Sequence, residues 1–118
     1  MIELRAWDKK NKIYIYITGF MIDENIIKLW WKYDDHTNSI FDESFPIDQI
    51  ILEQYTTKKD KNSKKIYAGD IVKYEYWEYV IIFNKGGFVM ERDDRLQYYF
   101  PIPNNKLKII GNIHEVTK

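Results

Sequence analysis

The sequence predicts a mainly β protein in which an N-terminal β lobe with at most one short helical turn precedes a small C-terminal barrel. Isoleucine, valine, tyrosine and tryptophan recur in short runs separated by Asp, Asn, Lys and Gly, a pattern typical of strands joined by turns. The runs are closest together in the second half of the chain. At 118 residues the chain is long enough for about one domain.

The first two strands are expected at residues 2–7 and 13–18, because apolar side chains alternate with others in both segments. Between them Asp8–Lys12 offers Asp and Asn side chains that hydrogen-bond a tight connection, so the two strands form a hairpin. A third strand is expected at Ile26–Tyr33, and the polar run Asp34–Ser39 turns the chain back.

Residues 46–55 fit two structures. Ile47, Ile50 and Ile51 suit one face of a helix, whereas Ile50–Tyr55 also suits a strand. We expect one helical turn that starts at Pro46 and is followed by a strand. The segment after it, residues 58–65, holds five lysines and one aspartate and is predicted to be an exposed basic loop in a chain of zero net charge.

The C-terminal part begins with a turn at Ala68–Asp70. Lys85-Gly86-Gly87 supplies residues that tolerate positive φ in a tight hairpin, and Pro101 and Pro103 fall in a connection where no N–H donor is needed. The count and spacing of the strands favour an SH3-like barrel. The strands are expected at 71–76, 79–84, 88–92, 96–100 and 107–113.

The predicted organisation is an N-terminal β lobe at 1–57, the exposed basic loop at 58–65 and the barrel lobe at 66–118, all within one compact unit. Tyr79–Phe83 is apolar at every position, so both faces of that strand need cover. The N-terminal strands or a second copy of the protein could provide it. We favour the N-terminal strands, because an intramolecular layer costs less ordering entropy.

The composition excludes several classes of protein. There is no cysteine, so disulfides, thiolate chemistry and sulfur-bound metals are excluded. The charged N-terminus differs from a signal peptide, and no apolar stretch approaches the length of a membrane span. We therefore expect a cytoplasmic protein that does not contact the membrane.

Residues suited to catalysis or metal binding are sparse. His36 and His114 lie in unrelated segments without the spacing of metal ligands, and Asp34-Asp35-His36 and Asp93-Asp94 are more typical of solvated turns. Gly86-Gly87 lacks the Lys-Ser/Thr and helix of a phosphate-binding loop, and no serine lies in a nucleophile motif. We expect no enzymatic activity, no metal and no cofactor.

Five blocks along the chain form a pattern seen in a known family. They are Arg5–Asp8, Gln54–Thr56 with Lys59–Asn62, Lys65–Tyr67, Gly69–Val72 and Ile110–Ile113. Together these blocks resemble the YopX family of phage and prophage proteins, whose function is uncharacterised. The departures are Thr57 and Ser63, where that family usually has glycine, and His114, where an aromatic residue is common. The resemblance implies an SH3-type barrel in the C-terminal part and a bacterial host cell as the location.

Two binding hypotheses follow. The first is a protein-interaction module that binds a host or phage protein through Tyr74, Tyr76, Trp77 and Tyr79, since aromatic residues are favoured at interfaces. The alternative for these side chains is packing against the N-terminal lobe. The second hypothesis is nucleic-acid binding, and self-association is compatible with both. The phosphate contacts would come from the basic loop, at Lys58, Lys59, Lys61, Lys64 and Lys65.

Overall fold

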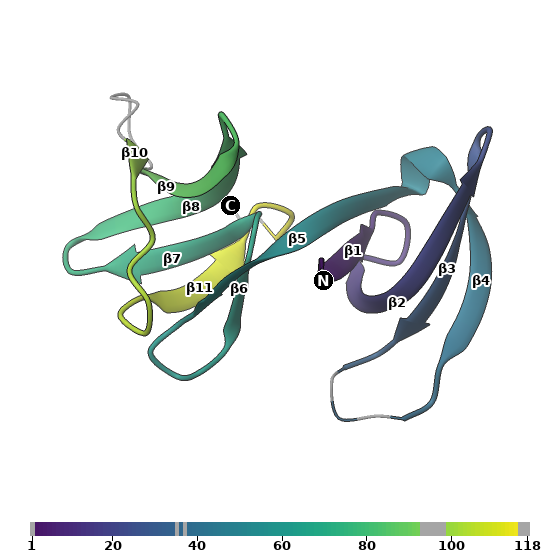
Figure 1. The fold of residues 1–118 in the computed structure, drawn as a ribbon, viewed down its shortest axis with the longest axis horizontal. Helices are drawn as coiled ribbons and strands as arrows, with labels where there is room; N and C mark the ends of the chain where they lie inside the picture. Colours follow the sequence, from purple (N-terminus) through teal and green to yellow (C-terminus); the bar gives the residue numbers. More distant parts are fainter. Residues whose placement is uncertain (1, 35, 37, 93–98, 116–118) are drawn as a thin grey trace. The chain divides into compact units, whose positions relative to one another are not determined.

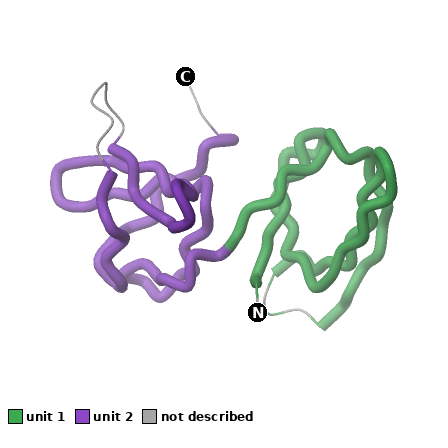
Figure 2. The backbone as a smooth tube through the Cα atoms, turned by 45° about the horizontal axis from the view of Figure 1, so that its top comes forward, with its two compact units in different colours: residues 1–54 green, residues 55–118 purple. Residues whose placement is uncertain are grey.

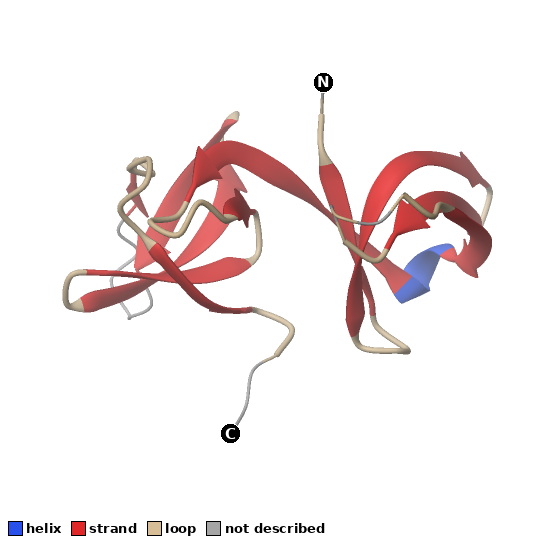
Figure 3. Ribbon diagram, turned by 90° about the horizontal axis from the view of Figure 1, so that it is seen from below, coloured by secondary structure: helices blue, strands red, loops and turns tan. Residues whose placement is uncertain are grey.

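The computed structural model describes residues 2–34, 36, 38–92 and 99–115. These residues form two compact units, unit 1 at residues 1–54 and unit 2 at residues 55–118 (Figure 2). Strands dominate both units, and the described residues contain one short helical element (Figure 3). The prediction of a mainly β protein is confirmed. No helix in the described ranges has the length and apolar character needed to cross a membrane.

Unit 1 is built on an antiparallel sheet in the order β4-β3-β2-β1-β5, in which β4 forms one edge (Figure 1). Strand β5 continues beyond unit 1 and pairs there with a strand of unit 2. The strands are β1 (Leu4–Asp8), β2 (Ile13–Asp23), β3 (Ile26–Lys32), β4 (Phe41–Pro46) and β5 (Ile50–Lys59).

The predicted N-terminal hairpin is confirmed, with Leu4 opposite Ile17 and Asp8 opposite Ile13. Strand β2 runs further than its alternation indicates, because an irregularity between Ile17 and Gly19 adds one residue and lets pairing with β3 continue to Asp23. Strand β4 was not predicted. Its sequence has no apolar alternation, because four of its six residues are polar or proline, and all four are exposed. Such a composition is common in edge strands.

The ambiguous stretch after Phe45 resolves as predicted. A 3-10 turn, η1 (Ile47–Gln49), follows Pro46, and Ile50 then returns to an extended conformation that begins β5. Proline has no N–H to lose at such a start, and Ile50 enters the core of unit 1.

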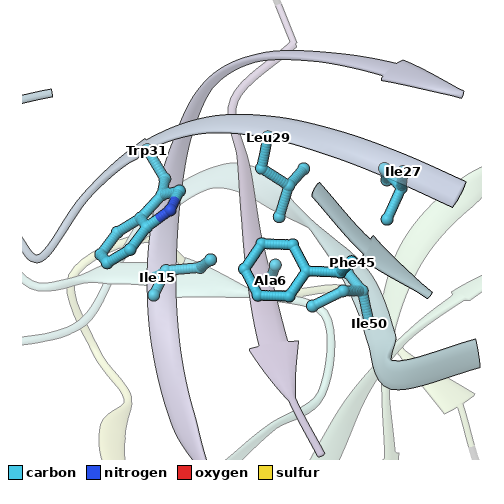
Figure 4. Close-up of a cluster of buried hydrophobic side chains, with 7 residues drawn as sticks. All are labelled: Ala6, Ile15, Ile27, Leu29, Trp31, Phe45 and Ile50. Atoms are coloured by element: carbon cyan, nitrogen blue, oxygen red, sulfur yellow. The ribbon is translucent and has the colours of Figure 1, made fainter. Parts of the chain in front are cut away.

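The core of unit 1 is a layer of aliphatic and aromatic side chains on one face of the sheet. Figure 4 shows these side chains, which come from all five strands of the unit. The packed members of this core are Ala6, Ile15, Ile27, Leu29, Trp31, Phe45 and Ile50.

Unit 2 contains an antiparallel sheet in the order β10-β9-β8-β7-β11, and β6 pairs with the end of β5. The described strands do not close into a ring, so the SH3-like barrel stays a prediction. Of the strand expected at 96–100, the described residues include only the last two, which form β10. The strands are β6 (Lys65–Tyr67), β7 (Asp70–Tyr74), β8 (Trp77–Asn84), β9 (Gly87–Arg92), β10 (Tyr99–Phe100) and β11 (Lys108–Asn112).

Strand β8 contributes to the core of unit 2 from one face. Tyr79 and Ile81 are buried there with Met90, whereas Val80 and Ile82 on the other face are half-buried. At the end of the strand Phe83 is exposed. Which layer covers the second face, the N-terminal strands or a second copy, stays a prediction.

The basic loop is shorter than expected. Strand β5 extends through Lys59 and β6 begins at Lys65, and these two residues face each other across the ladder. The lysine-rich composition concealed this pairing, because neither strand end shows apolar alternation. The connection between the strands is therefore a five-residue turn at 60–64.

Candidate functional site

The four aromatic residues singled out from the sequence have different environments. Tyr79 is buried, and its ring packs edge-on against Phe100 with centroids 5.6 Å apart. Tyr74 is half-buried against the same core. Tyr76 is almost fully exposed at the tip between β7 and β8, while Trp77 is about half exposed. Packing within unit 2 therefore accounts for part of this aromatic group and not for all of it.

A pocket of about 360 Å³ opens beside Tyr74 and Tyr79. Its volume lies within the range of known ligand sites. The other lining residues are Glu75, Met90, Phe100 and the segment 101–103. The structure thus brings two of the four predicted residues together in one concave site and leaves Tyr76 and Trp77 outside its lining.

Two tyrosine hydroxyl groups lie beside this pocket. Tyr79 is 94% buried, since its exposed fraction is 6%, and Tyr74 is half-buried. Within the described parts of the chain, neither hydroxyl has a hydrogen-bond partner in the protein. Both hydroxyl oxygens are accessible to solvent, because Trp31 Nε1 is the one buried side-chain N or O atom without a partner among the described residues. Two hydroxyl groups therefore lie beside the pocket without a protein acceptor.

Glu75 provides the charge of the pocket lining. It is the first residue of the turn between Tyr74 and Trp77, which face each other across β7 and β8, and its φ is 57°. That backbone conformation is uncommon for a residue other than glycine. No ion pair or hydrogen bond of the Glu75 carboxylate is found among the described residues, so the lining carries an uncompensated negative charge.

Trp77 contacts a cation just outside the lining. The guanidinium of Arg92 lies over its indole ring at 4.0 Å from the ring centroid. Arg92 faces Tyr79 across β8 and β9 in the sheet. Within the described part of the chain, Arg92 thus lies over Trp77 and does not line the pocket.

The basic segment is organised by a buried carboxylate. Asp60 is 1% exposed, and its Oδ1 accepts hydrogen bonds from the backbone N–H groups of Asn62 and Lys64 at 2.8 and 2.9 Å. Its Oδ2 accepts one from Ile109 at 3.3 Å. The sequence indicated Asp60 only as a charge that offsets lysines. In the fold it is the acceptor around which the turn is built.

The five predicted lysines divide between two environments. Lys59, Lys61 and Lys64 are exposed, whereas Lys58 and Lys65 are half-buried, the latter with its ammonium group 5.5 Å from the ring centroid of Tyr55. Only part of the set is therefore directed fully into solvent.

The fold adds two lysines to this surface. The N–H of Lys61 donates to the carbonyl of Leu107, and the N–H of Asn105 donates to the carbonyl of Lys59. These bonds hold the turn against the segment that carries the exposed residues Lys106 and Lys108. We call the exposed lysines at 59, 61, 64, 106 and 108 the basic patch. The sequence could not reveal it, because its two segments lie more than forty residues apart.

The histidines lie in local turns. The backbone N–H of His36 donates to Asp34, and that of His114 donates to Asn112. Among the described residues, no group of three or more His, Asp or Glu side chains lies close enough together to hold a metal ion. Asp35 and Asp93-Asp94, which were predicted to be in turns, fall outside the described residues.

Sequence reasoning missed most of the pocket. Glu75, Met90 and Phe100 come from a turn and two strands, and Pro101 and Pro103 were interpreted only as residues of a connection. The run Phe-Pro-Ile-Pro at 100–103 was the available signal, since prolines next to an aromatic residue can form an apolar wall without N–H donors.

Comparison with known proteins supports the family and the fold. A crystal structure of protein EF1440 from Enterococcus faecalis is similar, with a TM-score of 0.63 and 21% sequence identity over 98% of this chain and 94% of that chain. At this identity the likeness concerns the fold alone. No curated protein matches the sequence. Residues 3–118 match the family described as YopX protein. The chain therefore belongs to the YopX family.

Proposed function

We propose that this protein is a non-enzymatic interaction module of phage or prophage origin, which binds a host or phage protein through the pocket beside Tyr79. One observation supports this most directly: a tyrosine that is 94% buried lines a 360 Å³ pocket with a hydroxyl that has no acceptor among the described residues. The hydroxyl oxygen is accessible to solvent, so it can donate to a bound partner in place of water. A partner that supplies an acceptor would gain about 0.5–1.5 kcal/mol from that hydrogen bond.

The composition of the pocket suits a protein ligand. Aromatic side chains bury a large area with little loss of rotamer freedom, which is why they are enriched at interfaces. Tyr74, Tyr79 and Phe100 provide such area, and two hydroxyl groups and one carboxylate beside them can fix the orientation of a bound side chain.

The test uses affinity capture from prophage-induced or infected host lysate, after which the recovered partner is purified and its affinity is measured by calorimetry. Tyr79→Phe removes only the hydroxyl, and Tyr74→Ala removes one aromatic wall. We expect both to weaken binding about tenfold. Tyr76→Ala is the control, because Tyr76 is 93% exposed and does not line the pocket.

Thermal unfolding of each variant shows whether the fold is retained. The proposal is wrong if folded Tyr79→Phe and Tyr74→Ala proteins bind every captured partner as tightly as Tyr76→Ala does. It is also wrong if no protein is retained selectively by the wild-type chain.

A second candidate function is nucleic-acid binding at the basic patch. The observation that favours it is the backbone pairing that brings Lys106 and Lys108 to the turn at 60–64. Several exposed lysines on one surface can contact phosphates, with an affinity that falls as salt is raised. Replacing the five lysines of the patch by Gln should abolish salt-dependent binding to labelled single-stranded and duplex oligonucleotides, measured by fluorescence anisotropy. Salt-independent binding, or binding unchanged by the replacements, excludes this function.

A further inference from the structure

We propose that the occupant of the pocket is an arginine side chain of the partner protein, with its guanidinium against Tyr74 or Tyr79 and paired with Glu75. This inference depends on the proposed function, since it specifies the chemistry of the group that enters the same pocket. Charge complementarity and an arginine cluster elsewhere in this protein support it.

Unit 1 contains a cluster of one arginine, one tyrosine and one glutamate. The guanidinium of Arg5 lies over the ring of Tyr14 at 3.9 Å from the centroid, and its Nε donates to Oε1 of Glu53 at 2.9 Å. Its Nη2 donates to the hydroxyl of Tyr14 at 3.1 Å, and that hydroxyl donates to Glu53 at 2.9 Å. One arginine, one tyrosine and one glutamate thus bind one another, with Arg5 and Glu53 buried and Tyr14 half-buried.

Among the residues that the structure describes, the pocket of unit 2 offers the tyrosine and glutamate of such a cluster without the arginine. Tyr74, Tyr79 and Glu75 all line it. In the ranges that the structure describes, Glu75 has no ion pair and neither tyrosine hydroxyl has a hydrogen-bond partner. A carboxylate and aromatic rings together favour a cation, through charge pairing and through the ring quadrupole.

The aromatic residues of the lining favour arginine over lysine. A guanidinium is planar, stacks on aromatic rings and is weakly hydrated, whereas an ammonium group is a compact, strongly hydrated charge. The methylene groups of an arginine can lie along Met90 and the segment 101–103, which form the apolar part of the lining.

The nearby Arg92 does not neutralise the carboxylate of Glu75. Its guanidinium stacks on Trp77, which is outside the lining, and Glu75 has no ion pair with it. The stacking at 4.0 Å shows instead that an aromatic ring on this face of the sheet already binds a guanidinium.

The experiment is an NMR titration of the full-length protein with three capped tripeptides, acetyl-Gly-X-Gly-amide, in which X is arginine, lysine or norleucine. We expect the arginine peptide to shift the amide signals of Tyr74, Glu75 and Tyr79 saturably, with a dissociation constant on the order of millimolar. The lysine peptide should bind at least about threefold more weakly, and norleucine weaker still.

The matched variants are Glu75→Gln and Glu24→Gln. Glu24 has a φ of 56° in the turn between β2 and β3, close to the 57° of Glu75, but lies in unit 1 and does not line the pocket. Glu75→Gln should weaken the arginine peptide about threefold to tenfold, and Glu24→Gln should leave its affinity unchanged. Equal shifts with all three peptides, or an affinity unaffected by Glu75→Gln, would overturn the inference.

The outcomes separate this inference from the proposed function. One outcome is that the norleucine peptide shifts the pocket signals at least as strongly as the arginine peptide, while Tyr79→Phe still loses the captured partner. In that case the proposed function stands, and the inference that the occupant is an arginine is wrong. If no peptide shifts those signals and Tyr79→Phe retains the partner, both are wrong.

Discussion

Arg5 and Glu53 form a buried ion pair between the neighbouring strands β1 and β5. The distance between Arg5 Nη2 and Glu53 Oε1 is 2.9 Å, and the two side chains are 7% and 5% exposed. They face each other in the ladder, and β1 lies between β2 and β5. Arg5 belongs to the first block of the family resemblance, so this block has a structural explanation.

Removing one member of this pair should destabilise the protein strongly. Arg5→Met leaves the Glu53 carboxylate buried without its cation, at a cost of about 3–5 kcal/mol. Urea denaturation monitored by tryptophan fluorescence measures the change. The double variant Arg5→Met/Glu53→Leu should recover much of the loss, because both charges are absent. A double variant as unstable as Arg5→Met would contradict the buried-charge explanation.

The stability of unit 1 should depend on pH through Asp8. Burial raises the pKa of this carboxyl, but hydrogen bonds from the side chains of Gln49 and Asn11 and from the backbone N–H groups of Asn11 and Lys10 outweigh it, so the pKa is lowered overall. The folded pKa therefore lies below the unfolded value of about 3.9. The stability that Asp8 contributes is complete above that value and is lost as the pH falls through it towards the folded pKa.

The free energy of unfolding of the wild type and of Asp8→Asn, measured between pH 3 and pH 6, tests this dependence. We expect the wild type to be more stable by about 1–2 kcal/mol at pH 6, and the difference to narrow as the pH falls. A difference that is constant across the range would mean that the Asp8 carboxyl does not titrate with folding.

Asp60 should determine the order of the turn at 60–64. Asp60→Ala leaves the N–H groups of Asn62, Lys64 and Ile109 without their acceptor, which should cost about 2–3 kcal/mol. Hydrogen exchange at these three amides should accelerate. Asp48→Ala is the control, since Asp48 is exposed in η1. Unchanged exchange in Asp60→Ala would show that the backbone pairing of β5 and β6 orders the turn without the carboxylate.

Thr57 and Ser63 should each tolerate glycine with a gain in stability. Their φ angles are 73° and 66°, in the region that favours glycine, and both stand where the YopX resemblance expects glycine. Thr57→Gly should stabilise the protein by up to about 1 kcal/mol, because relief of steric strain exceeds the added entropy of the unfolded chain.

Thermal unfolding measures this gain. The control is Thr18→Gly, because Thr18 lies in β2 without a positive φ and its hydroxyl donates to the carbonyl of Trp30. That change should destabilise the protein. Equal losses at Thr57 and Thr18 would show that the positive φ at Thr57 carries no strain.

Local patterns predicted the strands that have one buried face. Ile13, Ile15 and Ile17 alternate with tyrosines, and the Asp8–Lys12 turn hydrogen-bonds as expected, with Asp8 accepting from Lys10 and Asn11. Strand β4 and the end of β5 were missed for a common reason. Their side chains are mostly polar and exposed, so their pairing depends on a neighbouring strand and leaves no periodic signal.

The candidate site was predicted only in part. Tyr74 and Tyr79 were identified by their aromatic character, but nothing in the local sequence separates them from Tyr76, which is exposed at a hairpin tip. Tyr74 and Tyr79 differ from Tyr76 because they lie within the paired part of β7 and β8, whereas Tyr76 lies in the turn between them. Tyr79 also packs against Phe100, which is distant in the sequence.

The sequence by itself determined the β class, the hairpin turns near residues 8–12 and 85–87, and the family, whereas the turns at 24–25 and 75–76 were not predicted. These depend on side-chain alternation, on turn residues and on motifs, all of which act over a few neighbouring residues. Only the tertiary structure decided that Asp60 is buried, that Lys106 and Lys108 join the turn at 60–64, and that Glu75 lies beside Tyr79 and Phe100. Those relations depend on hydrogen bonds and packing between segments distant in the chain, which no local pattern encodes.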